Sequence, residues 1–178
     1  MCKSQYRKSP RAAFLDYNSG MFFVTICTKD MKCYFGEISE GEMHLSAIGA
    51  FVSEQLGRAS KFNSTFDVVL YVVMPNHIHA IVVLNDNDIY YEDPYMQQRA
   101  VNPSERGNGY EKRHVMLLSR YVNSLKGTIT KYARSIGSDF MWHRRYYDHM
   151  IRGNEDARNI TNYILNNVYM WNEDEYYS

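Results

Sequence analysis

The feature that most constrains the fold is a pair of consecutive apolar runs, FDVVLYVVM at residues 66–74 and HIHAIVVL at residues 77–84. Both runs are rich in the β-branched and aromatic residues that favour strands. Pro75-Asn76 stands between them; proline presets the first dihedral of a turn, and asparagine tolerates the second turn position. The sequence therefore predicts two antiparallel neighbouring strands joined by a tight turn.

The remaining segments complete a recognisable order. A strand is predicted at residues 21–28, a small hairpin with a Glu-Gly turn at 34–45, and a further strand at 144–151. With helices between them, the larger elements run strand, helix, strand, strand, helix, strand and a final helix. This order predicts an α+β fold, the ferredoxin-like split βαβ sandwich, in which two helices cover one face of an antiparallel sheet. The opposite face is left for a site or for the final helix.

Apolar periodicity predicts the helices. The first covers residues 46–60, and the second covers residues 115–136 with one apolar stripe, formed by Leu118, Val122, Leu125, Ile129, Tyr132 and Ile136. Asn154 is the expected cap of the last helix, with Glu155 and Asp156 in its first turn, where the helix dipole favours anions. This helix is expected to bury Ile160, Ile164, Val168 and Trp171.

Length and composition indicate one domain. The 178 residues suffice for a single core, so residues 1–178 are expected to form one unit with a basic N-terminal arm at 1–14 and a long polar loop at 85–113. No apolar run is long enough to span a bilayer, and the N-terminus lacks the apolar core of a secretory signal. The three cysteines form no paired framework. These features predict a cytoplasmic protein without a membrane partner.

Two histidines open the second apolar run. Alternation in a strand places His77 and His79 on one face, about 6–7 Å apart at the backbone, so their nitrogens can converge on one metal ion. Two satisfied polar residues at a strand end are the commoner explanation of such a pair, but unpaired imidazoles are costly in a buried strand. Tyr163 and Asn167 lie four residues apart and therefore on one helix face, from which both could approach the histidines. Spacing alone favours a packing role for Tyr163.

Two segments together resemble a known family. MPNHIHAIVVL and FMWHRRYYDHMIRGNEDARNITNYILNN are similar to motifs of the single-tyrosine HUH transposases, especially the REP-associated tyrosine transposase branch. The family's His-hydrophobic-His motif is matched by His77-Ile78-His79, and its nucleophilic tyrosine, in a Tyr-Ile-x-Asn-Asn type segment, corresponds to Tyr163. The resemblance covers roughly residues 15–170. The pattern W-x-R-x-[FY]-[YWF]-[DE]-H-x-I-R is matched by Trp142, Arg144, Tyr146, Tyr147, Asp148, His149, Ile151 and Arg152. Val168 departs from the family, because relatives usually have proline there.

The resemblance implies nicking and rejoining of single-stranded DNA at hairpin-containing sites, for transposition or a domesticated role in repeat processing. His77 and His79 would hold Mg²⁺ or Mn²⁺ with Asn167 as third ligand, and Tyr163 would form a 5′-phosphotyrosine intermediate. His149 is expected to be a further ligand, a group behind the ligands, a DNA contact or a structural residue. Two alternatives stay open: a metal-dependent hydrolase that uses the histidines with an activated water, and a non-catalytic protein that binds DNA hairpins.

Single-stranded DNA requires cations for its backbone and flat side chains for its bases. The net charge is zero, so a DNA-binding surface would be a local patch. The basic N-terminus is one candidate, a face of the 115–136 helix another and the Trp142–Tyr147 block a third, although a solvated helix face explains the second equally well. The expected DNA-binding residues are Arg120, Lys126, Lys131, Arg134, Trp142, Arg144, Arg145, Tyr147 and Arg152. Both a monomer and a homodimer are compatible with the sequence.

Overall fold

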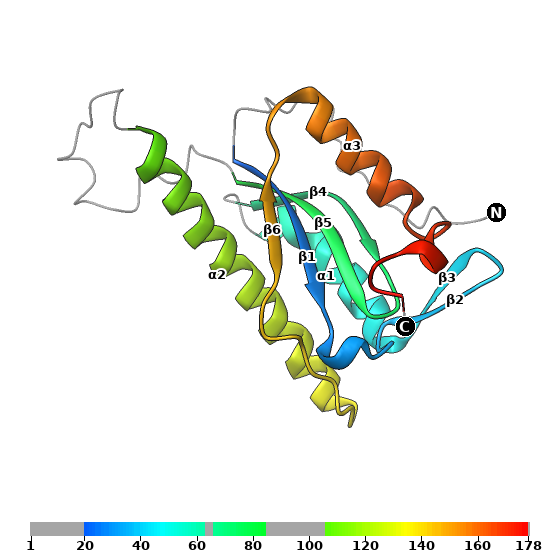
Figure 1. Cartoon of the computed structure of the whole chain (residues 1–178). Coiled ribbons are helices and arrows are strands. Elements are labelled where there is room, and N and C mark those ends of the chain that lie inside the picture. Colours follow the sequence, from blue (N-terminus) through cyan, green and yellow to red (C-terminus); the bar gives the residue numbers. More distant parts are fainter. Residues whose placement is uncertain (1–19, 63–65, 85–105, 178) are drawn as a thin grey trace.

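A computed structural model describes residues 20–62, 66–84 and 106–177 of the chain (Figure 1). The expected basic arm at 1–14 and the greater part of the expected loop at 85–113 lie outside these residues. Among the described residues, no helix has both the length and the apolar character needed to cross a membrane.

An antiparallel sheet of four strands forms the centre, in the order β4-β5-β1-β6. The strands are β1 (Met21–Cys27), β4 (Phe66–Val73), β5 (His77–Leu84) and β6 (Tyr147–Met150). β5 pairs antiparallel with both β4 and β1, and β1 pairs antiparallel with β6. The sheet thus has the strand order of the split βαβ sandwich, and the predicted fold class is confirmed.

The sheet is buried on both faces by different helices. On one face, a core cluster joins sheet residues such as Phe22 and Ile78 to α1 (Ala47–Phe62) and α2 (Arg106–Ser135). On the other face, a second cluster joins sheet residues such as Phe23 and Ile81 to α3 (Gly153–Asn166) and to the segment after it. Figure 1 shows α3 in front of the sheet and α1 behind it. The final helix therefore covers part of the face that the helix pair leaves open.

A small two-stranded hairpin, β2 (Gly36–Ser39) and β3 (Glu42–Leu45), precedes α1. Its turn uses Glu40 and Gly41, both with positive φ, as the hairpin-specific turn types require. At the start of α1, Ser46 Oγ accepts the backbone N–H of Gly49 and so caps the helix. Both features agree with the elements predicted from the sequence.

The boundaries of α2 differ from those predicted. The helix begins at Arg106, inside the segment expected to be loop, and ends at Ser135. Gly137, with a φ of 75°, closes the helix: its N–H donates to Arg134 O and the N–H of Ser138 donates to Ala133 O. Ile136 therefore lies beyond the last turn and is 49% exposed, so its predicted place in the buried stripe was wrong. Ala133 is the buried residue at this end of the helix.

The strand predicted at residues 144–151 is shorter than expected. It begins only at Tyr147, the first residue that pairs with β1, and it ends at Met150. The backbone of His143 still donates to Cys27 O, but the Lys126 ammonium donates to the carbonyls of His143 and Arg145. These carbonyls are thereby tied to α2 instead of to a strand partner.

The start of α3 also differs from the prediction. The helix begins at Gly153, and the flanking residue is Arg152, so Asn154 is not the cap. Asp156 Oδ2 instead accepts the backbone N–H of Arg152, which satisfies a donor at this end. Ile164 is buried within the helix as predicted. Val168 and Trp171 are buried as well, but they lie beyond its last residue, Asn166.

Candidate active site

The tight turn before β5 positions the first histidine. Asn76 is fully buried, and its amide nitrogen donates to the carbonyls of Met31 and Tyr176. These two contacts set the orientation of the amide, so Asn76 Oδ1 faces His77 Nδ1 at 2.8 Å. Because a carbonyl oxygen only accepts, Nδ1 carries the ring hydrogen and His77 Nε2 is left with its lone pair. This buried nitrogen has no hydrogen-bond partner among the described residues.

The second histidine is oriented by the neighbouring strand. His79 Nδ1 lies 2.9 Å from the hydroxyl of Thr25, its register partner on β1. Phe23 stacks on the same imidazole, with ring centroids 5.2 Å apart. Burial lowers the pKa of His77 to about 4 and also lowers the pKa of His79, so both rings are neutral near pH 7. Neutral imidazole is the form that binds metal ions.

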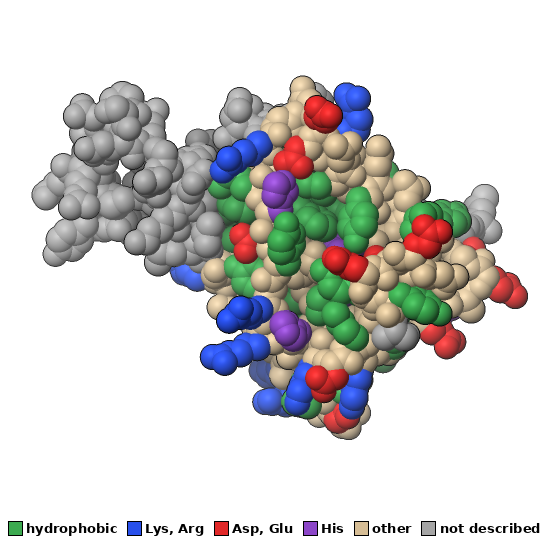
Figure 2. All heavy atoms as spheres, in the orientation of Figure 1, with side chains coloured by type: hydrophobic (Ala, Val, Ile, Leu, Met, Phe, Trp, Pro, Cys, Tyr) green, Lys and Arg blue, Asp and Glu red, His purple; other side chains and the backbone are tan. Residues whose placement is uncertain are grey.

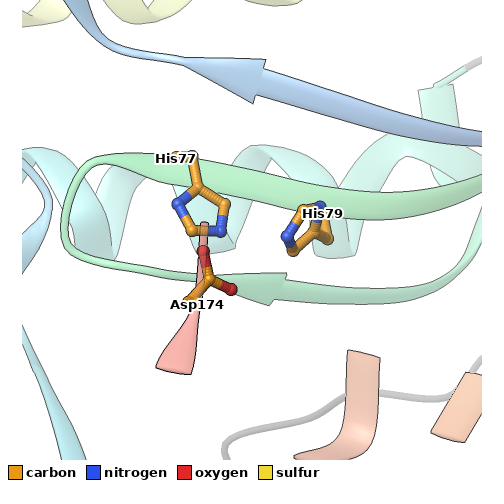
Figure 3. Close-up of side chains that lie close together, drawn as sticks. All are labelled: His77, His79 and Asp174. Carbon is orange, nitrogen blue, oxygen red and sulfur yellow. The ribbon is translucent and has the colours of Figure 1, made fainter. Parts of the chain in front are cut away.

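A carboxylate from the C-terminal segment completes a cluster with the two histidines (Figure 3). Asp174 follows a 3₁₀ turn at Trp171–Glu173, and one ligand atom each of His77, His79 and Asp174 lies within 4.8 Å of the others. Asp174 is held in place because its Oδ1 accepts the backbone N–H of Tyr176. Two imidazoles and a carboxylate at this spacing are a common donor set for a divalent metal ion.

Asn167, the ligand expected from the resemblance, lies next to this cluster. Its side chain is buried, and its amide nitrogen donates to Asp174 Oδ2 at 2.8 Å. Its carbonyl oxygen has no partner among the described residues, as is also true of His77 Nε2. Buried acceptors without donors are costly, and a cation would satisfy both atoms. The donor atoms therefore fit a divalent metal.

Tyr163 projects from α3 toward the same point. Its hydroxyl oxygen lies 3.2 Å from His79 Nε2 and 3.4 Å from Asp174 Oδ2. The side chain is 41% exposed, so it lies between the cluster and solvent. Partial burial, followed by the charges of Asp174 and Glu175, raises the pKa of Tyr163 to about 12. The phenol is thus protonated near pH 7 and has two acceptors for its proton within reach.

His149 does not belong to this cluster. It lies on β6, and its Nε2 is 2.9 Å from Asp156 Oδ2, on the first turn of α3. The structure therefore gives this side chain a carboxylate partner that joins the edge strand to α3, away from the three clustered ligands.

The expected DNA-binding residues fall into three groups. Lys126 and Trp142 are used within the fold, because Lys126 donates to two carbonyls and Trp142 Nε1 donates to Lys126 O. Arg120, Lys131 and Arg134 are exposed on α2, which packs on the opposite face of the sheet from the cluster. The remaining residues are exposed beside or within β6, the edge strand that β1 separates from β5: Arg144, Arg145, Tyr147 and Arg152. Figure 2 shows hydrophobic side chains in the middle of the face that carries α3, with Lys and Arg side chains along its border.

Asp174 was missed by the reasoning from sequence. Asp174 lies in the acidic tail NEDEYYS, which contains no motif for metal ligation. No spacing rule points to Asp174, because it lies beyond the end of α3, where the helical period does not apply.

The chain is similar to several known proteins. No protein-family model matches the chain. An uncharacterized protein of Haemophilus influenzae is 30% identical over 174 residues, which are 97% of this chain and 93% of that protein. A candidate transposase of Deinococcus radiodurans shares 15% identity over 90% of this chain and 97% of its own, with a TM-score of 0.46.

A solved structure of a REP-associated tyrosine transposase bound to a REP hairpin has a TM-score of 0.50. The two proteins share 18% identity, and the similarity covers 85% of this chain and 68% of the other. The chain therefore belongs to the same family as the Haemophilus influenzae protein, and its fold is that of a REP-associated tyrosine transposase.

Proposed function

We propose that this protein nicks and rejoins single-stranded DNA through a covalent 5′-phosphotyrosine intermediate on Tyr163, with a divalent metal held by the histidine pair. One observation carries the proposal: the Tyr163 hydroxyl lies 3.2 Å from His79 Nε2, beside three clustered metal-ligand side chains. A hydrolase that activates water would have no need for a phenol at this position.

The residues that would hold the metal are His77, His79 and Asp174, with Asn167 Oδ1 as a fourth donor. Mg²⁺ and Mn²⁺ are both compatible with a set of nitrogen and oxygen donors. When bound, such an ion supplies Lewis-acid polarisation of a phosphate and stabilises negative charge on its oxygens.

The protein's own groups carry the covalent step. The Tyr163 oxygen attacks the scissile phosphorus, the bond from phosphorus to the 3′ oxygen breaks, and the 5′ phosphate becomes attached to the tyrosine. Because a bound metal would use His79 Nε2, the phenol proton passes to the solvent that reaches the 41% exposed Tyr163 side chain, and the departing 3′ oxygen takes up a proton from solvent. Because the phosphodiester bond energy is kept in the phosphotyrosine, a 3′-hydroxyl can attack it and restore a DNA strand.

A hairpin-containing single strand is the proposed substrate. The fold shared with a transposase that was solved with a REP hairpin supports this choice. The exposed arginines Arg144 and Arg145, which precede β6, would neutralise backbone phosphates. The exposed cations of α2 provide a second surface for the double-stranded stem.

Incubation with labelled single-stranded hairpin oligonucleotides and Mg²⁺ or Mn²⁺ tests the proposal. We expect a covalent protein–DNA adduct that resists denaturing electrophoresis, and we expect Tyr163→Phe to abolish the adduct while DNA binding remains. Tyr169→Phe is the matched control, because Tyr169 is 76% exposed and its hydroxyl can be removed without loss of core packing.

Three other results would contradict the proposal in different ways. An adduct that survives Tyr163→Phe would show that another nucleophile acts. Metal-dependent cleavage without an adduct, unchanged by Tyr163→Phe, would identify a hydrolase. Hairpin binding without cleavage in either metal would identify a protein that only binds DNA.

A further inference from the structure

Part of the sheet face next to Tyr163 is lined by aromatic side chains that the proposed chemistry does not use. On this face, Phe23 of β1 lies between the positions of β5 and β6, because β1 is the strand between them. Tyr147 of β6 pairs in register with Thr25, the residue that orients His79. Tyr147 is therefore one strand away from Thr25 and two strands away from His79.

Phe23 connects the two exposed tyrosines. Its ring is 9% exposed and contacts Tyr163 at a centroid distance of 6.0 Å and an interplanar angle of 85°. It contacts Tyr147 at 6.5 Å and 70°. Both tyrosine rings are thus steeply inclined to the ring of the same phenylalanine; Tyr163 belongs to α3 and Tyr147 to β6.

Tyr147 keeps most of its own surface in solvent, since it is 57% exposed. Its T-shaped contact with Phe23 is an ordinary packing geometry, and this contact leaves more than half of the side chain exposed. An exposed aromatic ring on an edge strand is the kind of surface on which a nucleobase stacks.

We infer that Tyr147 is a stacking platform for the nucleobase adjacent to the phosphate that Tyr163 attacks; this inference rests on the proposed nicking function. Because both rings contact Phe23, a strand with its phosphate at Tyr163 would bring a base about one or two nucleotides away to Tyr147. Arg144 and Arg145, which precede Tyr147, are exposed and would meet the backbone on that side. The pair of His149 with Asp156 bounds the surface at the other end of β6.

The chemistry of the occupant follows from these contacts. An aromatic face accepts any base, whereas arginines next to it select for phosphate. Tyr147 is therefore a positioning residue that holds the scissile linkage in line with Tyr163, and stacking on it depends little on base identity. Its effect should be confined to one or two positions of the substrate.

The experiment uses hairpin oligonucleotides in which each nucleotide within three positions of the cleaved phosphate is replaced, one at a time, by an abasic residue. Adduct formation is measured as KM and kcat for the unaltered protein, Tyr147→Leu and Tyr147→Phe. With intact DNA, we expect Tyr147→Leu to lower kcat/KM by roughly 5- to 150-fold, the range for loss of one base stack, and Tyr147→Phe to retain most of the activity.

Non-additivity is the decisive result. At one or two adjacent positions, removal of the base should slow the unaltered protein as much as Tyr147→Leu does, and should cause no further loss in that variant. Tyr169→Leu, which removes a more exposed ring outside the donor cluster, should respond to every abasic position as the unaltered protein does. Equal further losses for Tyr147→Leu at all positions, or activity of Tyr147→Phe as low as that of Tyr147→Leu, would overturn the inference.

A binding measurement separates this inference from the proposed function. The same oligonucleotides are titrated by fluorescence anisotropy into Tyr163→Phe, which needs no chemistry, with and without Tyr147→Leu. Position-specific loss of affinity without an adduct in the unaltered protein would support the platform while refuting the nicking function. Adduct formation with uniform dependence on Tyr147 would refute the platform alone, and absence of single-strand binding would refute both.

Discussion

At the residue scale, the chemistry of the site depends on hydrogen bonds that set which ring nitrogen carries a proton. The Nδ1 atom of His77 donates to Asn76 Oδ1, and the Nδ1 atom of His79 is hydrogen-bonded to the hydroxyl of Thr25. The Nε2 atoms of both rings are consequently the ones that face Asp174 and Tyr163. Such partners behind metal ligands commonly orient the ligands and raise their basicity.

The lowered pKa of His77 predicts how stability depends on pH in metal-free protein. The pKa rises from about 4 in the folded state to the ordinary 6.5 on unfolding, so between these values the unfolded chain binds the extra proton. Stability is fully present above pH 6.5 and falls as the pH is lowered toward 4, by up to about 3 kcal/mol from this group. Urea unfolding in EDTA across this range measures the effect.

The comparison variant for this prediction is His77→Gln, which removes the titrating ring. Its unfolding free energy should decline less steeply between pH 6.5 and 4 than that of the unaltered protein. Parallel pH curves for the two proteins would show that His77 is solvated in the folded state.

The residues of the site differ in how well the sequence predicts them. His77 and His79 follow from strand alternation, which is local, and Tyr163 follows from its motif and from helical spacing to Asn167. Asp174 does not follow from either rule, because it lies beyond the end of α3, where no period relates it to the helix. The contact of Thr25 with His79 depends on the register of β1 against β5, and the contact of Asn76 with His77 depends on the conformation of the buried turn. A single sequence determines neither of them.

At the scale of elements, α1 shows how packing overrides helix propensity. Gly49 lies in its first turn, and a Cβ there would come within 2.0 Å of Phe35 O, the residue that precedes the hairpin. Propensity alone predicts that alanine stabilises a helix by about 0.5–1 kcal/mol relative to glycine. The close backbone contact predicts the opposite sign here.

We therefore expect Gly49→Ala to destabilise the protein by about 1–3 kcal/mol, as overpacking usually does. Gly127→Ala on α2 is the matched variant, because a Cβ there meets nothing within 4 Å among the described residues. That change should stabilise the protein by about 0.5–1 kcal/mol. Urea midpoints for the two variants test the pair, and a stabilised Gly49→Ala would show that α1 does not press on Phe35.

The same distinction explains which element boundaries could be predicted. The apolar stripe of α2 and the two runs around Pro75 are long and periodic, so their existence and type were predicted correctly. The end of α2 depends on the left-handed conformation of Gly137. The start of β6 depends on the hydrogen bonds that Lys126 donates to the carbonyls of His143 and Arg145. Tertiary contacts of this kind leave no local pattern.

At the scale of the whole molecule, the site joins segments that are far apart in the sequence. β5 supplies the histidines, α3 supplies Tyr163, the chain just beyond α3 supplies Asn167, and the C-terminal segment supplies Asp174. The contact of Asn76 with Tyr176 O further ties this last segment to the turn before β5. A ligand that bridges these parts should stabilise the folded chain as a unit, because the unfolded chain does not hold the donors together.

Metal binding is accordingly expected to raise the thermal midpoint. At a free metal concentration of 100 times Kd, the folded state gains about 2.7 kcal/mol, which corresponds to roughly 5–10 °C for a chain of this length. Differential scanning calorimetry with Mn²⁺ or Mg²⁺, and again after addition of EDTA, measures the shift.

Replacement of both His77 and His79 by Ala should remove the shift in the thermal midpoint. Asp174→Asn, which changes a half-buried side chain less drastically, should reduce it, and His44→Ala should leave it intact because this exposed imidazole lies on β3, outside the cluster. An equal midpoint shift in all four proteins would mean that the metal binds elsewhere, and the donor cluster would then have to be explained by the hydrogen bonds among its own side chains.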